Sequence, residues 1–145
     1  MRGFVVFIVA ITVGLLCVFG FSSDDDSQVE TFPLLNTDLV LEVRKKHAHP
    51  FLAEYDFKLV LRSGKTELDH ANMTGDTGGL SRIEVFKNNE TTFAFRDHAK
   101  TVCLNIDSER FKECDSVSLG KQIGFFDFDS ERNWRFVSRQ KEEKQ

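Results

Sequence analysis

The chain has 145 residues, of which 19 are basic and 23 acidic, so that its formal net charge at pH 7 is −4. This acidic balance argues against nucleic acid as the main partner, because binding to a phosphate backbone needs a basic surface. The part beyond the N-terminal segment has the length of one domain, and most of the 15 phenylalanines lie there to supply a core.

Residues 4–21 form an apolar run of 18 residues without a charged side chain. As a helix this run would be about 27 Å long, close to the thickness of the hydrocarbon layer of a membrane. Arg2 precedes the run and aspartates 24–26 follow it, a distribution that directs the C-terminal part across the membrane. We therefore expect residues 24–145 to be secreted, or to face the exterior or a lumen on a single-pass anchor.

Two interpretations of residues 1–23 remain open. Only three residues precede the apolar run, and Val18 and Gly20 are small enough to flank a cleavage site, as in a signal peptide. The run is longer than the usual apolar region of a signal peptide, which favours a retained anchor through residues 4–21. Cys17 follows a leucine and therefore does not fit a lipoprotein signal.

Residues 24–37 are predicted to be a polar, acidic stem and residues 38–140 an extracellular β-rich domain. Several segments of this domain alternate apolar and polar side chains, the period of half-buried antiparallel strands. The alternating residues are Leu39, Leu41 and Val43; Tyr55, Phe57, Leu59 and Leu61; Ile83 and Val85; Phe93 and Phe95; and Val102, Leu104 and Ile106. Turn residues at 87–90 and 97–99 predict a three-stranded meander over residues 80–106.

The C-terminal third has a different pattern. The sequence DSER occurs at 107–110 and at 129–132, and each copy has the capping residues of a helix start. The second copy leads to Trp134 and Val137, whose spacing predicts one side of a short helix, although alternation leaves a strand possible. The run GFFDFD before it predicts a buried strand, and residues 141–145 a charged tail. The predicted fold is mainly β, an antiparallel meander or small sandwich with a short C-terminal helix.

Cys103 and Cys114 are the only cysteines beyond the N-terminal segment. In an oxidising compartment such a pair indicates a disulfide, and closing this loop would stabilise the domain by about 3 kcal/mol. The alternatives are free thiols, an intermolecular disulfide, or a zinc site that would need two further ligands. Two sequons, which begin at Asn72 and Asn89, lie in polar, turn-like surroundings and agree with glycosylation in the same compartment.

Histidines and lysines gather in the sequence KKHAHPF. His47 and His49 could hold a metal together with His70 or His98, but no third ligand has a fixed spacing, so we expect no metal site and no cofactor. Lys45 and Lys46 are expected to be a solvated strand end.

The triplet Asp76-Thr77-Gly78 matches the surroundings of the catalytic aspartate in aspartic proteases. That chemistry needs two carboxylates that share a proton, so a single copy would require a dimer. Polar residues precede Asp76 where those proteases have an apolar strand, and a glycan on Asn72 would stand beside the site. A glycine-rich surface loop accounts for the same residues. We therefore expect no enzyme, and we keep a protease that uses Asp76 as an alternative.

From Gly79 to Asp107 the order of features resembles the start of a BRICHOS domain. In that family a strand that ends in an aromatic residue is followed by a polar turn, a second apolar strand, another turn and a cysteine that begins an apolar strand. The corresponding segments here are Ile83–Phe86, Asn88–Asn89, Phe93–Phe95 and Cys103–Leu104. The resemblance implies an extracellular β-rich domain, often on a single-pass membrane protein, with chaperone-like activity toward β-prone segments.

Together these features predict a secreted or membrane-anchored binding module whose partner is an extracellular or membrane protein or peptide. An exposed strand edge would offer one way to bind an extended segment of that partner. A second alternative is a subunit of a membrane complex, in which residues 4–21 are themselves the interaction surface.

Overall fold

The computed structural model describes residues 28–34, 37–49, 51–52, 54–75, 82–115, 119–128, 131 and 133–139. The N-terminal segment with Cys17, aspartates 24–26, Asp76 and the tail 141–145 lie outside the described residues. Within these ranges, no helix has the length and apolar character that crossing a membrane requires.

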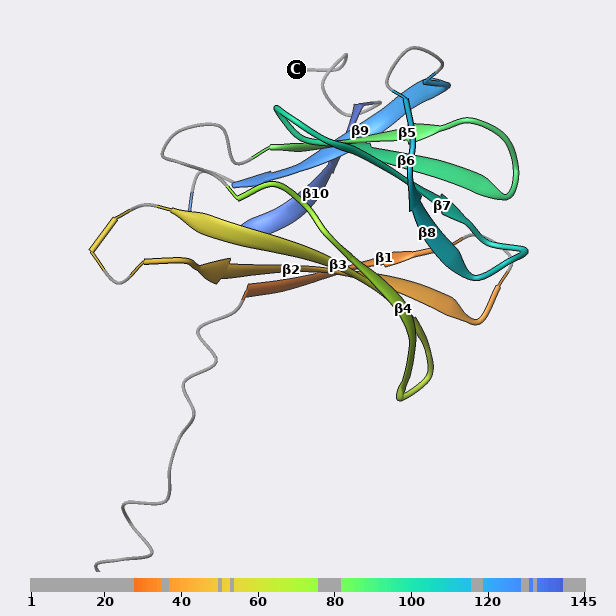
Figure 1. The fold of residues 1–145 in the computed structure, drawn as a ribbon, viewed down its shortest axis with the longest axis horizontal. Helices are drawn as coiled ribbons and strands as arrows, with labels where there is room; N and C mark the ends of the chain where they lie inside the picture. Colours follow the sequence, from red (N-terminus) through yellow and green to blue (C-terminus); the bar gives the residue numbers. More distant parts are fainter. Residues whose placement is uncertain are drawn as a thin grey trace, which may run out of the picture.

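The described residues form two antiparallel β-sheets that pack face to face (Figure 1). The first sheet has the order β1-β2-β3-β4. Its strands are β1 (Gln28–Pro33), β2 (Leu39–His47), β3 (Tyr55–Ser63) and β4 (Thr66–Asn72). The second sheet has the order β10-β9-β5-β6-β7-β8. Its strands are β5 (Ile83–Lys87), β6 (Thr92–Arg96), β7 (Thr101–Asn105), β8 (Arg110–Glu113), β9 (Lys121–Phe128) and β10 (Trp134–Ser138). The predicted mainly β, antiparallel fold is confirmed.

The core lies between the two sheets and is built from the alternating residues of the central strands. Side chains with no exposed surface come from β2, β3, β5, β6, β7 and β9; they include Leu41, Val43, Leu59, Leu61, Ile83, Val85, Phe95, Leu104 and Phe126. Alternation puts every second side chain of a strand on the same face of its sheet, which is why these residues meet. The predicted meander over residues 80–106 is confirmed as β5, β6 and β7.

The C-terminal part differs from the prediction, because Trp134–Ser138 forms strand β10 where a short helix was expected. β10 pairs with β9, and Trp134 lies opposite Phe128 while Phe136 lies opposite Phe126. Trp134 is buried and its ring stacks on Phe57 of the other sheet, with 5.1 Å between the ring centroids. Packing against strands far away in the sequence therefore overrides the local helical spacing. The first DSER sequence also starts no helix, since residues 107–109 form the turn between β7 and β8 and Arg110 begins β8.

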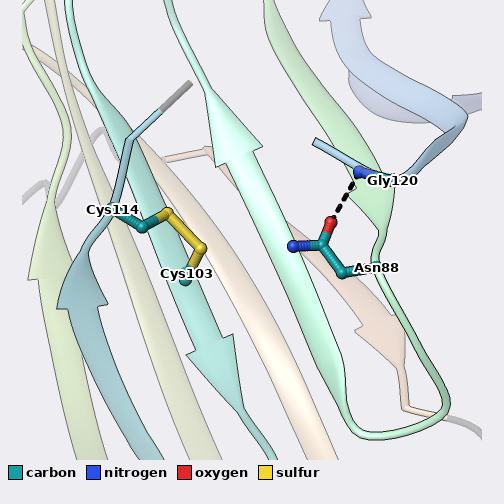
Figure 2. Close-up of a disulfide and its surroundings, with 4 residues drawn as sticks. All are labelled: Asn88, Cys103, Cys114 and Gly120. Carbon is teal, nitrogen blue, oxygen red and sulfur yellow. Dashed lines mark hydrogen bonds between the residues drawn. A yellow bond between two sulfur atoms is a disulfide. The ribbon is translucent and has the colours of Figure 1, made fainter. Parts of the chain in front are cut away.

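The connection from β8 to β9 has to reach the far side of β5, because β9 pairs with β5 and not with β8. A disulfide between Cys103 and Cys114 holds the start of this connection, with 2.10 Å between the sulfur atoms, as the cysteine count predicted (Figure 2). At its other end the N–H of Gly120 donates to Asn88 Oδ1 over 2.9 Å (Figure 2). A Cβ atom at Gly120 would lie 2.2 Å from the carbonyl oxygen of Lys87, so this close approach requires glycine.

The edge strands of the two sheets lie next to each other along two seams, one between β4 and β8 and one between β1 and β10. At the first seam the N–H of Phe111 donates to Asp69 Oδ2 over 2.8 Å. At the second seam the N–H of Phe136 donates to Glu30 Oε1 over 3.4 Å. A carboxylate of the first sheet thus bonds to the edge backbone of the second sheet at both seams.

The register of β1 shows at which end the chain enters the sandwich. Gln28 lies opposite Lys45, near the end of β2, so β1 begins beside the loop that joins β2 to β3. This loop protrudes at the left of Figure 1. We call this side the entry end; it carries the loop between β2 and β3. The turn at 97–100 lies on the same side, where it bonds to Asn72 and Thr74 at the end of β4. Gln28–Pro33 lies in the segment expected to be a stem and belongs to the sandwich as β1.

Candidate binding site

A buried lysine lies at the entry end and corrects one prediction. Lys45 was expected to be solvated, but it is only 3% exposed, because it continues the inward-facing series of β2. Its Nζ lies 3.4 Å from the centroid of the Tyr55 ring, 3.2 Å from that of Phe128 and 5.5 Å from that of Trp134. An ammonium group against aromatic faces is favourable, and more so when water is excluded. This cluster joins β2, β3, β9 and β10 and stiffens the base of the protruding loop.

Two large apolar side chains are exposed at the end of that loop. Phe51 is 88% exposed and Leu52 is 53% exposed, and we call this pair the apolar tip. Below it the loop is closed by a backbone hydrogen bond of 2.9 Å, in which Ala48 donates to Glu54. The His47 ring packs against Tyr55 at 4.5 Å between centroids. Adjacent exposed apolar side chains on a supported loop are typical of a contact surface.

The outer face of the first sheet has a hollow of about 460 Å³ near the entry end. Side chains of β2 and β3 line it, and we call it the basic hollow because three of the lining residues, Arg44, Lys46 and Lys58, are cationic. The lining is completed by Asp56, Asn72, Phe57 and Met73. Its volume is in the range of small-molecule sites, roughly 300–1,000 Å³.

Acidic neighbours engage two of the three cations. The Arg44 guanidinium lies 2.7 Å from Glu42 Oε2, and Lys58 Nζ lies 3.4 Å from Glu67 Oε1. Desolvation raises the pKa of Glu67, but the charge of Lys58 and hydrogen bonds from Lys58 and His70 outweigh it and hold the pKa below its usual value. Glu67 is therefore ionised at neutral pH. Lys46 has no ion-pair partner among the described residues.

The two sequons lie at opposite ends of the domain. Asn72 is the exposed last residue of β4 and lines the basic hollow. Asn89 is exposed in the turn between β5 and β6, where its Oδ1 accepts the N–H of Thr91 over 2.9 Å. Both side chains are accessible to a modifying enzyme, and glycosylation of either remains a prediction.

The histidines have different partners and are not gathered into one site. His47 packs on Tyr55, whereas His70 Nδ1 lies 2.9 Å from Glu67 Oε1. In the described part of the chain, no three or more histidine, cysteine, aspartate or glutamate side chains form a group that could hold a metal.

Sequence reasoning missed the apolar tip and the basic hollow. Phe51 and Leu52 follow a proline between two strands, and an apolar pair in such a loop is a signal that could have been followed. The hollow gave no local signal, because Arg44 and Lys58 become neighbours only through the pairing of β2 with β3.

No protein-family model matches the chain, and neither the curated proteins nor the solved structures give a significant match. The class is therefore defined by the fold itself, an antiparallel β-sandwich with an internal disulfide, and the function has to be argued from its surface.

Proposed function

We propose that the chain is an extracellular or lumenal binding module that contacts a protein partner through the apolar tip. It is secreted, or held at a membrane through residues 4–21. The observation that carries the proposal is the exposure of Phe51 and Leu52, 88% and 53%, side by side. Burying such side chains at an interface would contribute about 1.5–3 kcal/mol each.

The support below the tip favours binding of a preformed surface. Lys45 and the rings around it fix the ends of β2 and β3, and the bond between Ala48 and Glu54 closes the loop. A loop that is already ordered loses little conformational entropy when it binds, and more of the contact energy remains as affinity.

The position of the tip bears on the kind of partner. Six residues, 22–27, separate the apolar run from β1, and β1 begins beside the loop that carries the tip. If residues 4–21 are retained in a membrane, the tip lies on the membrane-facing side and its partner is itself a membrane protein. The domain would then be a subunit of a membrane complex. If they are cleaved, the same surface is free to bind an extracellular protein.

The chaperone-like activity implied by the BRICHOS resemblance would act through an open strand edge. Carboxylates of Asp69 and Glu30 occupy edge N–H groups of β8 and β10, which leaves these edges less able to bind an added strand. We therefore assign the contact to the tip. The protease alternative depends on Asp76, outside the described residues, and no described contact favours it.

The test compares the double variant Phe51→Ser/Leu52→Ser with the wild type in binding to the surface of a panel of cell lines. Loss of two apolar contacts is expected to weaken saturable binding by roughly 100-fold or more. Val29→Ser is the matched control, because Val29 is also exposed but lies on β1. Equal binding by the double variant and the wild type, or no saturable binding to any line, contradicts the proposal.

A further inference from the structure

The basic hollow has an excess of positive charge in an otherwise acidic chain. Arg44, Lys46 and Lys58 carry three positive charges against one negative charge, on Asp56. Arg44 and Lys58 lie directly opposite each other in the pairing of β2 with β3. Like charges in this arrangement destabilise a sheet; Glu42 and Glu67 offset part of the repulsion, and an anion bound between the two cations would oppose the rest. The geometry therefore favours an anionic ligand.

A simple inorganic anion does not match the rest of the lining. Asp56 would repel it, and the described residues supply no hydrogen bond to the Asp56 carboxylate. A ligand hydroxyl could donate to this carboxylate, and the Asn72 amide could pair with a second hydroxyl. The ligand should thus combine one compact anion with several hydroxyls.

We propose that the basic hollow binds an acidic sugar, a saccharide unit that carries a carboxylate or sulfate group. The anion lies between Lys46, Lys58 and Arg44, and the hydroxyls bond to Asp56 and Asn72. Charge-assisted hydrogen bonds from lysine and arginine to such an anion are the strong contacts of the site. This site is separate from the apolar tip and does not depend on the protein partner proposed above.

The sequon at Asn72 has to be controlled in any test, because a glycan there would begin at the rim of the hollow. Thr74→Ala removes the sequon and leaves Asn72 in place. The structural hydrogen bond of Thr74 is made by its backbone N–H to Asp97 Oδ2 over 2.7 Å, so this substitution preserves it. The full-length Thr74→Ala protein from a secretory host is the starting material.

Saturation-transfer difference NMR measures binding of three probes, which are glucuronate, glucose and acetate. Glucuronate is expected to bind saturably and at least roughly tenfold more tightly than either of the other two, since only it has both the anion and the hydroxyls. Lys46→Gln/Lys58→Gln should weaken glucuronate binding by roughly tenfold. Lys112→Gln is the matched control, because Lys112 is an exposed lysine on β8, and it should leave glucuronate binding unchanged.

Two further variants make the assignment specific. Asp56→Asn should weaken glucuronate binding and strengthen acetate binding, because it replaces the charged acceptor of the hydroxyl with a weaker, neutral one and also removes a negative charge. Glu67→Gln should tighten glucuronate binding, because Lys58 loses its internal partner. Equal affinity for glucuronate and acetate, no change in the double lysine variant, or stronger binding of both anions to Asp56→Asn overturns the proposal. Circular dichroism and thermal unfolding of each variant confirm that the fold is retained.

Discussion

Asp69 on β4 accepts a hydrogen bond of 2.8 Å from the backbone N–H of Phe111 on β8, across the seam between the two sheets. Arg110 lies near the same carboxylate, with 3.8 Å between Nη1 and Oδ1. Glu30 plays the corresponding part at the opposite seam, where it accepts the N–H of Phe136. Edge strands with free N–H groups invite pairing with other chains, and a carboxylate bound to them opposes this.

Replacement of Asp69 tests the contribution of the first seam. Asp69→Ala should lower the free energy of unfolding by about 1.5–3 kcal/mol, the range for hydrogen bonds to charged groups. Asp69→Asn retains an oxygen acceptor and should lower the free energy of unfolding by a smaller amount. Urea titration measures the free energy of unfolding of both variants. Asp107→Asn, in the exposed turn between β7 and β8, is the control. Equal stability of Asp69→Ala and the control would show that the seam bond contributes nothing.

Replacement of Lys45 tests the aromatic cluster at the entry end. Lys45→Ala removes an ammonium group that lies 3.2 Å from the Phe128 centroid, together with its buried hydrocarbon stem. The expected loss of stability is about 2 kcal/mol or more, because the contact is desolvated. Thermal unfolding compares it with Lys46→Ala, the next and exposed residue, whose effect should stay within about 0.5 kcal/mol. A similar effect of the two substitutions would contradict the structural role of Lys45.

The disulfide should stabilise the domain through the unfolded chain. Cys103→Ala/Cys114→Ala is expected to lower the free energy of unfolding by about 3 kcal/mol, the chain-entropy value for a loop of this size. Chemical denaturation measures the difference, and reduction of the wild type under the same conditions should reproduce it. Reduced and oxidised protein of equal stability would contradict this role of the pair.

Glu67 should make stability depend on pH. Its lowered pKa means that the folded state favours the carboxylate, so the stabilisation is present above the pKa of the unfolded chain and is lost as the pH falls through the pKa of the folded state. Glu67→Gln should therefore be less stable than the wild type at about pH 7, and the difference should be smaller at about pH 3. Urea titrations at both values check this. A difference that is the same at the two pH values would contradict the assigned cause.

The central strands could be predicted because each has its own apolar alternation. The inward residues of β2 and β3, such as Leu41 and Leu59, are buried as that pattern indicates. The edge strands could not be predicted in this way. β4 (Thr66–Asn72) is largely polar, and its inward-facing Asp69 has a partner that only the seam supplies. The strand at Trp134 has a spacing that also fits a helix, and only its pairing with β9 decides between them.

The residues of the candidate sites were harder to predict than the strands, because tertiary structure brings them together. The rings around Lys45 come from three other strands, so its local sequence indicated a solvated position. The basic hollow depends on the register between β2 and β3. The disulfide was predictable because only two cysteines lie beyond the N-terminal segment.

Photo-crosslinking from position 51 on living cells tests the proposed binding module most directly. A photoreactive phenylalanine derivative replaces Phe51 in one sample and Glu109, in the turn at the opposite end of the domain, in another. We predict protein adducts of discrete mass from position 51 alone, which excess wild type suppresses and Phe51→Ser/Leu52→Ser does not. The same adducts from both positions, or no protein adduct from position 51, would contradict the assignment of the apolar tip as the contact surface.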